Sequence, residues 1–115
     1  MPSRYSKNYG NISVWAIDYL VAVRIDDMIE VSHTVDPDCK WFLFGSLCRN
    51  QRAPSDVDLL ILSDTIECCI EIRERLQAFI DANPIDLSIM TWREERELNF
   101  IRNTRAQSLH HSALD

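Results

Sequence analysis

The sequence predicts an α/β fold, in which helices and strands alternate along 115 residues. Apolar runs of strand length lie near residues 39–44, 57–62 and 85–90, and Gly, Pro, Ser or Asp residues bound them. Around these runs, apolar residues recur every three or four positions, as in amphipathic helices. The chain has the length of one ordinary domain, so we expect a single domain over 1–115 with tails at 1–10 and 104–115.

The first amphipathic segment predicts one helix from about residue 13 to residue 32, with Asn11 or Ser13 as its N-cap. The residues with helical spacing are Val14, Ile17, Val21, Ile25 and Met28. Residues 19–23 are rich in strand-forming types, so a strand there is the alternative. The sequence Asp-Pro-Asp at 36–38 predicts a turn.

The central part of the chain predicts two buried strands joined by a polar connection. The first strand covers 39–44, a short helix follows over 46–50, and 51–55 form a loop. The second strand, 57–62, is almost continuously apolar, which implies cover on both faces or burial beneath a partner.

A second long helix should begin at a capping box made by Asp64 and Glu67, and end before Asn83-Pro84. Its residues with helical spacing are Ile66, Ile70, Arg73, Leu76, Phe79 and Ile80.

The third strand, 85–90, alternates apolar and polar residues. Ile85, Leu87 and Ile89 share one face, and Asp86 and Ser88 share the other. A capping box of Thr91 and Glu94 then predicts a last helix over 92–102. We expect the two long helices to stack on one face of the sheet, which leaves the other face open around Asp56, Asp58 and Asp86.

An acidic pair at the start of the second strand indicates a metal site. Side chains alternate along a strand, so Asp56 and Asp58 should project to the same side. Two carboxylates on one face repel each other unless a cation lies between them. Oxygen ligands of this kind suit Mg²⁺, and Gly45-Ser46 at the end of the first strand can approach phosphate groups closely.

An apolar strand ending in Gly45-Ser46, followed about ten residues later by Asp56-x-Asp58, resembles the polymerase-β-like nucleotidyltransferase superfamily. The small size is similar to that of minimal nucleotidyltransferases (MNT-type). The resemblance implies a mixed sheet and a third carboxylate on the next strand, for which Asp86 stands in the right place. The sequence departs from many minimal members at 48–50, where Cys-Arg-Asn replaces Ala-Arg-Gly.

The resemblance implies catalysis with two divalent ions, Mg²⁺ or Mn²⁺, held by Asp56, Asp58 and Asp86. ATP or another nucleoside triphosphate would be the substrate. Gly45 and Ser46 would hold its phosphates, together with the N-terminus of the short helix.

The role of two loop arginines has two possible interpretations. Arg49 and Arg52 could neutralise developing negative charge, or they could be ordinary solvated loop residues.

The net charge and the lengths of the apolar stretches indicate which kinds of partner the chain does not bind. The net charge of −6 argues against an extended nucleic-acid surface, and no apolar stretch is long enough to span a bilayer. We expect a cytoplasmic protein with reduced thiols, because its cysteines lack metal-ligand spacing and an adjacent pair on a helix is no disulfide framework. These are Cys39, Cys48, Cys68 and Cys69.

The remaining ring-bearing residues have plain interpretations. We expect the histidines to be solvated and the tryptophans to serve as core or rim aromatics rather than base-stacking platforms. They are His33, His110 and His111, and Trp15, Trp41 and Trp92.

The leading functional hypothesis is transfer of a nucleoside monophosphate, most simply AMP from ATP, to a hydroxyl group. The resemblance implies that the acceptor lies on a helical HEPN-type partner, for which the chain would be the antitoxin; a homo-oligomer is the other expected assembly. Two alternatives stay open: a non-catalytic module that binds nucleotide or a partner, and an oligomer that modifies a small molecule.

Overall fold

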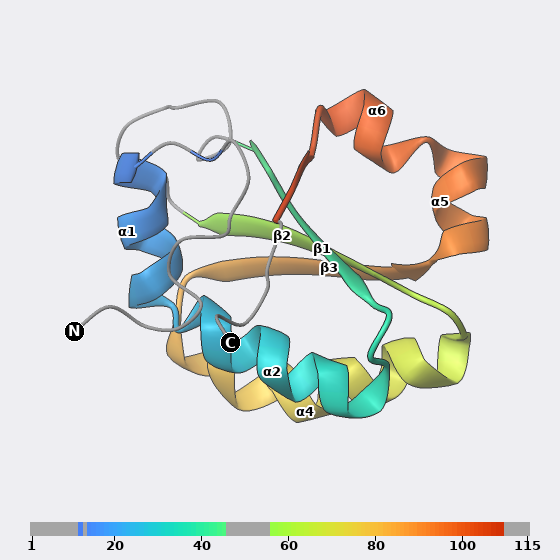
Figure 1. The fold of residues 1–115 in the computed structure, drawn as a ribbon, viewed down its shortest axis with the longest axis horizontal. Coiled ribbons are helices and arrows are strands. Elements are labelled where there is room, and N and C mark those ends of the chain that lie inside the picture. Colours follow the sequence, from blue (N-terminus) through green and yellow to red (C-terminus); the bar gives the residue numbers. More distant parts are fainter. Residues whose placement is uncertain (1–11, 13, 46–55, 110–115) are drawn as a thin grey trace.

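The structure is a computed structural model, and it describes residues 12, 14–45 and 56–109. Helices and strands alternate through most of this range, as the sequence predicts (Figure 1). In chain order the elements are α1 (Val14–Ala22), α2 (Ile25–Val35), β1 (Lys40–Phe44), β2 (Val57–Ser63), α4 (Ile66–Ala82), β3 (Ile85–Thr91), α5 (Trp92–Leu98), α6 (Phe100–Thr104) and β4 (Gln107–Ser108).

The strands form one mixed sheet in the order β3-β2-β1-β4. β1 pairs antiparallel with β2 and with β4, whereas β2 and β3 run parallel, with α4 as the crossover between them. The mixed sheet expected from the resemblance is therefore confirmed. Among the strands that the structure describes, β3 lies at the edge of the sheet, with β2 beside it.

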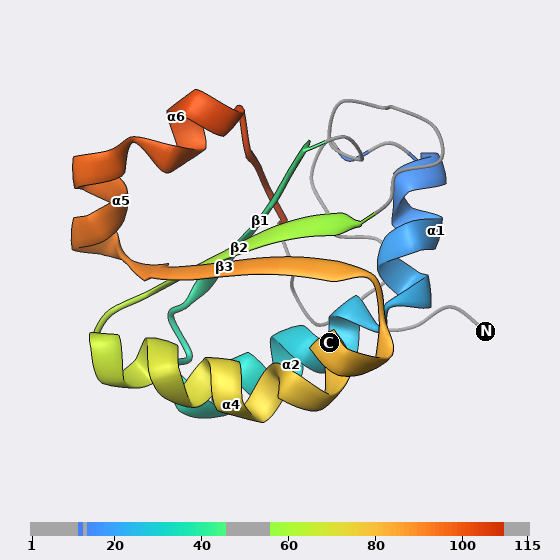
Figure 2. The same cartoon turned by 180° about the vertical axis from the view of Figure 1, so that it is seen from behind.

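The main core lies between one face of the sheet and the helices α1, α2 and α4. Alternate strand residues point into it, among them Leu43, Leu59 and Ile61, which are fully buried. α2 contributes Ile25, Met28 and Ile29, also fully buried. Both views show α2 and α4 on the same side of the sheet, as expected for the two long helices (Figures 1 and 2).

A smaller core covers part of the opposite face. It contains Leu60, Leu62 and Met90, with Phe100 and Ile101 of α6 packed against them. Figure 1 shows α5 and α6 on the side of the sheet opposite α2 and α4. The almost continuous apolar run of β2 is thus explained, because both of its faces pack against other elements.

Buried hydrogen bonds hold α2 to the sheet. The Ser32 hydroxyl donates to the Ile29 carbonyl (2.7 Å) and accepts from Trp41 Nε1 (2.9 Å). At the end of α2, the Asp36 carboxylate accepts hydrogen bonds from the Ser63 hydroxyl (2.6 Å) and the Asp64 backbone N–H (3.2 Å). Trp41 is therefore a core aromatic, as predicted.

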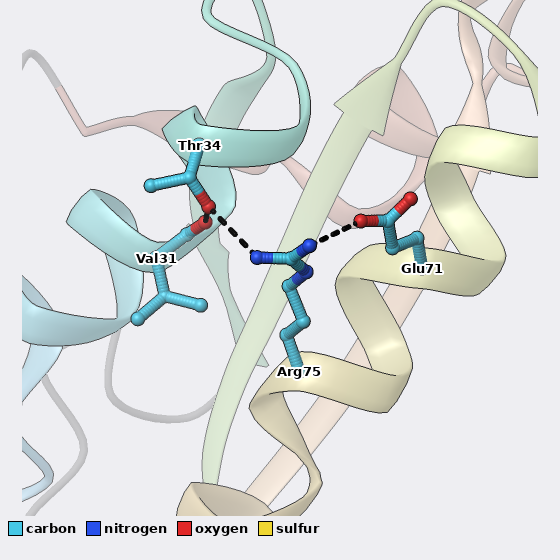
Figure 3. A network of polar contacts seen from close by, with 4 residues as sticks. All are labelled: Val31, Thr34, Glu71 and Arg75. Atoms are coloured by element: carbon cyan, nitrogen blue, oxygen red, sulfur yellow. Dashed lines mark hydrogen bonds and ion pairs between the residues drawn. The ribbon is translucent and has the colours of Figure 1, made fainter.

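The outer surfaces of α2 and α4 are joined by Arg75 (Figure 3). Its guanidinium forms an ion pair with Glu71 at 2.6 Å and donates to the Thr34 hydroxyl at 3.5 Å. Thr34 in turn donates to the Val31 carbonyl at 2.6 Å. The ion pair lies within α4 and both of its members are about half exposed, so it contributes little to stability; the hydrogen bond to Thr34 is the contact that links the two helices.

The predicted helix over 13–32 is wrong as a single element. Arg24 adopts a left-handed conformation (φ 63°, ψ 47°), which ends α1 and starts α2 in a new direction. Its side chain forms an ion pair with Asp27 at 2.8 Å and lies over the Phe79 ring. Because arginine carries no sequence signal for this conformation, the break could not be predicted. The alternative strand over 19–23 is also wrong, since these residues belong to α1 and the turn after it.

The last predicted helix is divided in the same way. Asn99 is left-handed (φ 51°, ψ 42°) and separates α5 from α6. Asn is one of the few residues that tolerate this conformation, so a signal was present but weak. The division lets α6 fold back over the sheet, where Phe100 packs edge-on against Phe44 with ring centroids 5.0 Å apart.

Two further sequence expectations need correction. The N-cap of α4 is Thr65, whose hydroxyl accepts from the Cys68 N–H, rather than Asp64. The expected tail after residue 104 is wrong in its first part: Gln107 and Ser108 pair with β1, and Leu109 is buried. By contrast, the capping box of Thr91 and Glu94 is confirmed.

The apolar stripe of α4 also differs from its predicted set. The residues that it buries fully are Ile72 and Leu76, whereas Ile66 and Ile70 are 60% and 55% exposed. Ile66 and Ile70 therefore lie outside the core, on the surface of the helix.

Among the described cysteines, Cys39, Cys68 and Cys69 are free thiols, as expected. No helix within the described ranges is long and apolar enough to cross a membrane. The predicted tail at 1–10, the helix at 46–50, the loop at 51–55 and Cys48 lie outside the described residues. So do the two tail histidines and the side chain of Trp15.

Candidate functional site

The face of the sheet that α6 covers is divided into an apolar part and an acidic part. Along β2, Asp58 shares this face with Leu60 and Leu62; along β3, Asp86 shares it with Met90. The leucines and Met90 lie beneath α6, whereas the aspartates lie where β2 and β3 begin. In Figure 1 this is the end of the sheet beside α1, and α5 lies at the other end. The expected open face is therefore confined to the acidic part.

Asp58 and Asp86 are direct neighbours across the parallel pair of β2 and β3. Paired residues on adjacent strands lie about 4.8 Å apart and project to the same side. Asp86 is exposed and Asp58 is partly buried, so the pair opens to solvent. The register thus places two of the three predicted carboxylates side by side on one face.

Gly45 lies against the Asp58 side chain. It follows β1 directly, and Phe44, the last residue of β1, pairs with Asp58. A Cβ atom at Gly45 would overlap the Asp58 carboxylate and lie 2.7 Å from its Cγ. Gly45 also has a positive φ of 76°, which other residues rarely adopt. The glycine is thus required twice, by its own backbone and by the carboxylate beside it.

Asp56 is exposed and lies in a bend immediately before β2. Because the regular strand begins at Val57, strict alternation of faces does not extend to Asp56. Its projection toward Asp58 stays a prediction.

A metal ion bound at the acidic end of the sheet would need ligands that converge on it. Within the described part of the chain, no three His, Cys, Asp or Glu residues converge closely enough to hold a metal ion. Asp58 and Asp86 nevertheless lie on neighbouring strands and offer the hard oxygen ligands that Mg²⁺ prefers. Gly45, which has no side chain, lies beside Asp58. Like charges separate when no cation lies between them, and the exposed Asp56 and Asp86 side chains have room to turn. The donor set therefore fits a divalent ion.

The other predicted site residues, Ser46, Arg49 and Arg52, lie outside the described residues. Their predicted contacts with phosphate remain predictions.

Two further residues border the site, and the sequence predicted one of them. Phe100 reaches Phe44, the register partner of Asp58, so α6 borders the acidic part of the face. Ser88 pairs with Leu60 and is partly buried on the same face, two residues beyond Asp86. The alternation of β3 predicted Ser88 on this face, whereas nothing in the sequence joined residues 44 and 100.

No protein-family model matches the chain, and no curated protein matches it in sequence. Solved structures do resemble it. One is a crystal structure of a provisionally assigned nucleotidyltransferase, 22% identical, with a TM-score of 0.61; the match covers 75% of this chain and 97% of that one. Another, a provisionally assigned nucleotidyltransferase from Sulfolobus solfataricus, is 18% identical with a TM-score of 0.52, over 76% and 84% of the two chains. The chain therefore has the fold of these nucleotidyltransferase-like structures, as its strand and glycine-serine pattern predicts.

Proposed function

We propose that this protein is a metal-dependent nucleotidyltransferase that transfers a nucleoside monophosphate from a nucleoside triphosphate, AMP from ATP in the simplest case, to a hydroxyl group. The observation that carries the proposal is the contact between Gly45 and Asp58 beside Asp86. The fold shared with the two structural neighbours supports it independently.

The acidic end of the sheet suits this chemistry because it gathers oxygen ligands at a solvent-accessible edge. In the proposal, Asp56 and Asp58 hold the divalent ions together with the triphosphate, and Asp86 completes the set from the neighbouring strand. When bound, Mg²⁺ ions would polarise the α-phosphate and offset the charge of the leaving pyrophosphate.

The glycine serves the same site from the other side. With no Cβ, Gly45 lets the backbone approach the Asp58 carboxylate, so phosphate oxygens bound there can also approach the residues after β1. We assign phosphate contacts to Gly45 and Ser46, and charge neutralisation to Arg49 and Arg52. In this proposal residues 46–55 form the triphosphate side of the site.

The transfer exchanges one bond of the α-phosphorus for another. The acceptor hydroxyl oxygen forms a bond to the α-phosphorus, and the bond from that phosphorus to the β-bridging oxygen breaks, which releases pyrophosphate. Asp86 receives the hydroxyl proton, because it lies on the exposed side of the pair. The acceptor would therefore approach along β3.

We propose a protein hydroxyl as the acceptor, on a helical partner of the HEPN type, as the sequence resemblance implies. In that case the chain would silence its partner by adenylylation, as an antitoxin does.

The experiment is incubation of the full chain with ATP labelled at the α-phosphate, Mg²⁺ and candidate acceptors, a co-expressed partner included. We expect label transfer and pyrophosphate release, both reduced at least about a hundredfold in Asp58→Asn. Transfer that Asp58→Asn leaves unchanged would overturn the proposal. ATP binding without pyrophosphate release would instead identify a non-catalytic nucleotide-binding module.

A further inference from the structure

A surface groove runs along α4 on the side of the molecule where β3 forms the sheet edge. It has a volume of about 690 Å³, and residues of α4, β3 and α5 line it. Ile66 and Ile70 form its apolar rim, while Cys69 and Ile89 lie deeper. Ile66 and Ile70 belong to neither the main core nor the acidic site, whereas Ile89 also packs against the main core.

The groove exposes two large aliphatic side chains of α4. Ile66 is 60% exposed and Ile70 is 55% exposed, although both are large aliphatic residues one helical turn apart. With Arg73 and Gln77 they form a stripe of spacing four, three and four along α4. From Ile66 to Gln77 the helix rises by eleven steps of about 1.5 Å, or about 16 Å, which is the length of three helical turns of a bound segment.

The edge strand itself is protected against strand addition. Arg73 reaches over from α4 and donates from Nη2 to the Leu87 carbonyl at 2.9 Å. This carbonyl lies on the outer edge of β3, so an added strand would have to displace the guanidinium. A helix, which satisfies its own backbone, needs no such displacement.

The groove has an acidic border, which favours a basic partner. Glu67 and Glu74 on α4 and Glu94 on α5 border the apolar stripe, against one guanidinium from Arg73. Glu71, further round α4, is already neutralised by its ion pair with Arg75 (Figure 3). A second copy of this chain would bring the same acidic border and the same net charge of −6 to the contact. A basic segment is therefore favoured over self-association.

We propose that this groove is a docking site for a basic amphipathic helix of a partner protein. Its apolar residues, spaced three and four apart, would cover Ile66 and Ile70, and its Lys or Arg residues would face Glu74 and Glu94. The inference does not rest on the proposed function, because Asp86 and Ile89 project to opposite faces of β3 and the groove excludes the acidic site.

The test is selection of binders to the full chain from a displayed library of randomised 16-residue helical peptides. We expect enriched peptides to carry apolar residues at spacings of three and four with flanking Lys or Arg. Ile70→Glu should weaken their binding at least tenfold, and Glu74→Lys several-fold, with the second effect reduced at high salt. Val21→Glu and Asp18→Lys on α1 are the matched controls, since both sites are exposed and distant in sequence from the groove.

Each other outcome contradicts the proposal. Enriched peptides that are acidic or lack helical spacing, or that bind Ile70→Glu as well as the wild type, would overturn it. Dimerisation of the wild-type chain that Ile70→Glu abolishes would show that a second copy occupies the groove. Thermal melts of all variants confirm that the substitutions leave folding intact. Because no nucleotide is present, failure here leaves the nucleotidyltransferase proposal untouched.

Discussion

Gly45 lies so close to Asp58 that any side chain at residue 45 would overlap the Asp58 carboxylate. The glycine directly follows β1 and the aspartate belongs to β2, and between them the chain passes through the connection at 46–55. The two halves of the sequence motif are thus one structural unit. This contact explains why a glycine is needed at the end of the strand that faces the acidic residue.

Gly45→Ala should destabilise the protein by about 2–5 kcal/mol, because backbone strain at positive φ and steric overlap with Asp58 both contribute. In an Asp58→Ala background the carboxylate is gone but a Cβ remains 3.0 Å away, so the same change should cost less, mainly the backbone strain of about 1–2 kcal/mol. Urea denaturation of the four proteins in this double-mutant cycle measures the difference. Equal costs in the two backgrounds would show that the contact carries no energy.

Mg²⁺ should stabilise the wild-type protein if the acidic end of the sheet binds it. At a concentration ten times the dissociation constant, the gain is about 1.4 kcal/mol, which appears as a higher melting temperature. Asp58→Asn and Asp86→Asn should each reduce this gain. Asp81→Asn, an exposed carboxylate on α4, serves as the control and should retain it. A gain of equal size in all four proteins would place the bound ion elsewhere.

Stability toward acid should depend on the pair Asp36 and Ser63. Burial raises the pKa of Asp36, but hydrogen bonds from Ser63 and from the backbone of Asp38 and Asp64, with the charge of His33, outweigh it, so the pKa lies below its usual 3.8. A lowered pKa in the folded state adds stability above the unfolded pKa, and this is lost as the pH falls through the folded value.

Ser63→Ala removes the 2.6 Å hydrogen bond to Asp36, so it should cost about 1–3 kcal/mol at neutral pH. It should also move the acid-induced loss of stability to higher pH. Urea denaturation between about pH 3 and pH 7 measures both effects. In an Asp36→Asn background, Ser63→Ala should leave the pH dependence unchanged; a shift there would implicate another group.

The N-cap of α4 is Thr65 in the structure, whereas the sequence predicted Asp64. Thr65→Ala should cost about 1 kcal/mol, because the Thr65 hydroxyl accepts from the Cys68 N–H at 3.1 Å. Asp64→Ala should change stability by less than about 0.5 kcal/mol, because the Asp64 side chain is exposed and does not cap the helix. Thermal or urea unfolding of both variants decides between the two caps. A larger loss of stability in Asp64→Ala than in Thr65→Ala would show that Asp64 is the N-cap.

The sequence by itself determined the elements whose signals are local. β1, β2 and β3 follow apolar runs bounded by turn residues, and Thr91 with Glu94 begins α5 as its pattern predicts. The polar side of β3 was also predictable, because alternation along a strand fixes which residues share a face.

Tertiary structure decided what depends on contacts between distant residues. The left-handed turn at Arg24, the fold-back of α6 onto Phe44 and the pairing of Gln107–Ser108 with β1 have no local signal. Register between β2 and β3 is likewise set by packing of the two strands against the helices, and it alone makes Asp58 and Asp86 neighbours. The residue types of the candidate site could thus be predicted from the sequence, whereas only the folded sheet brings them together on one face.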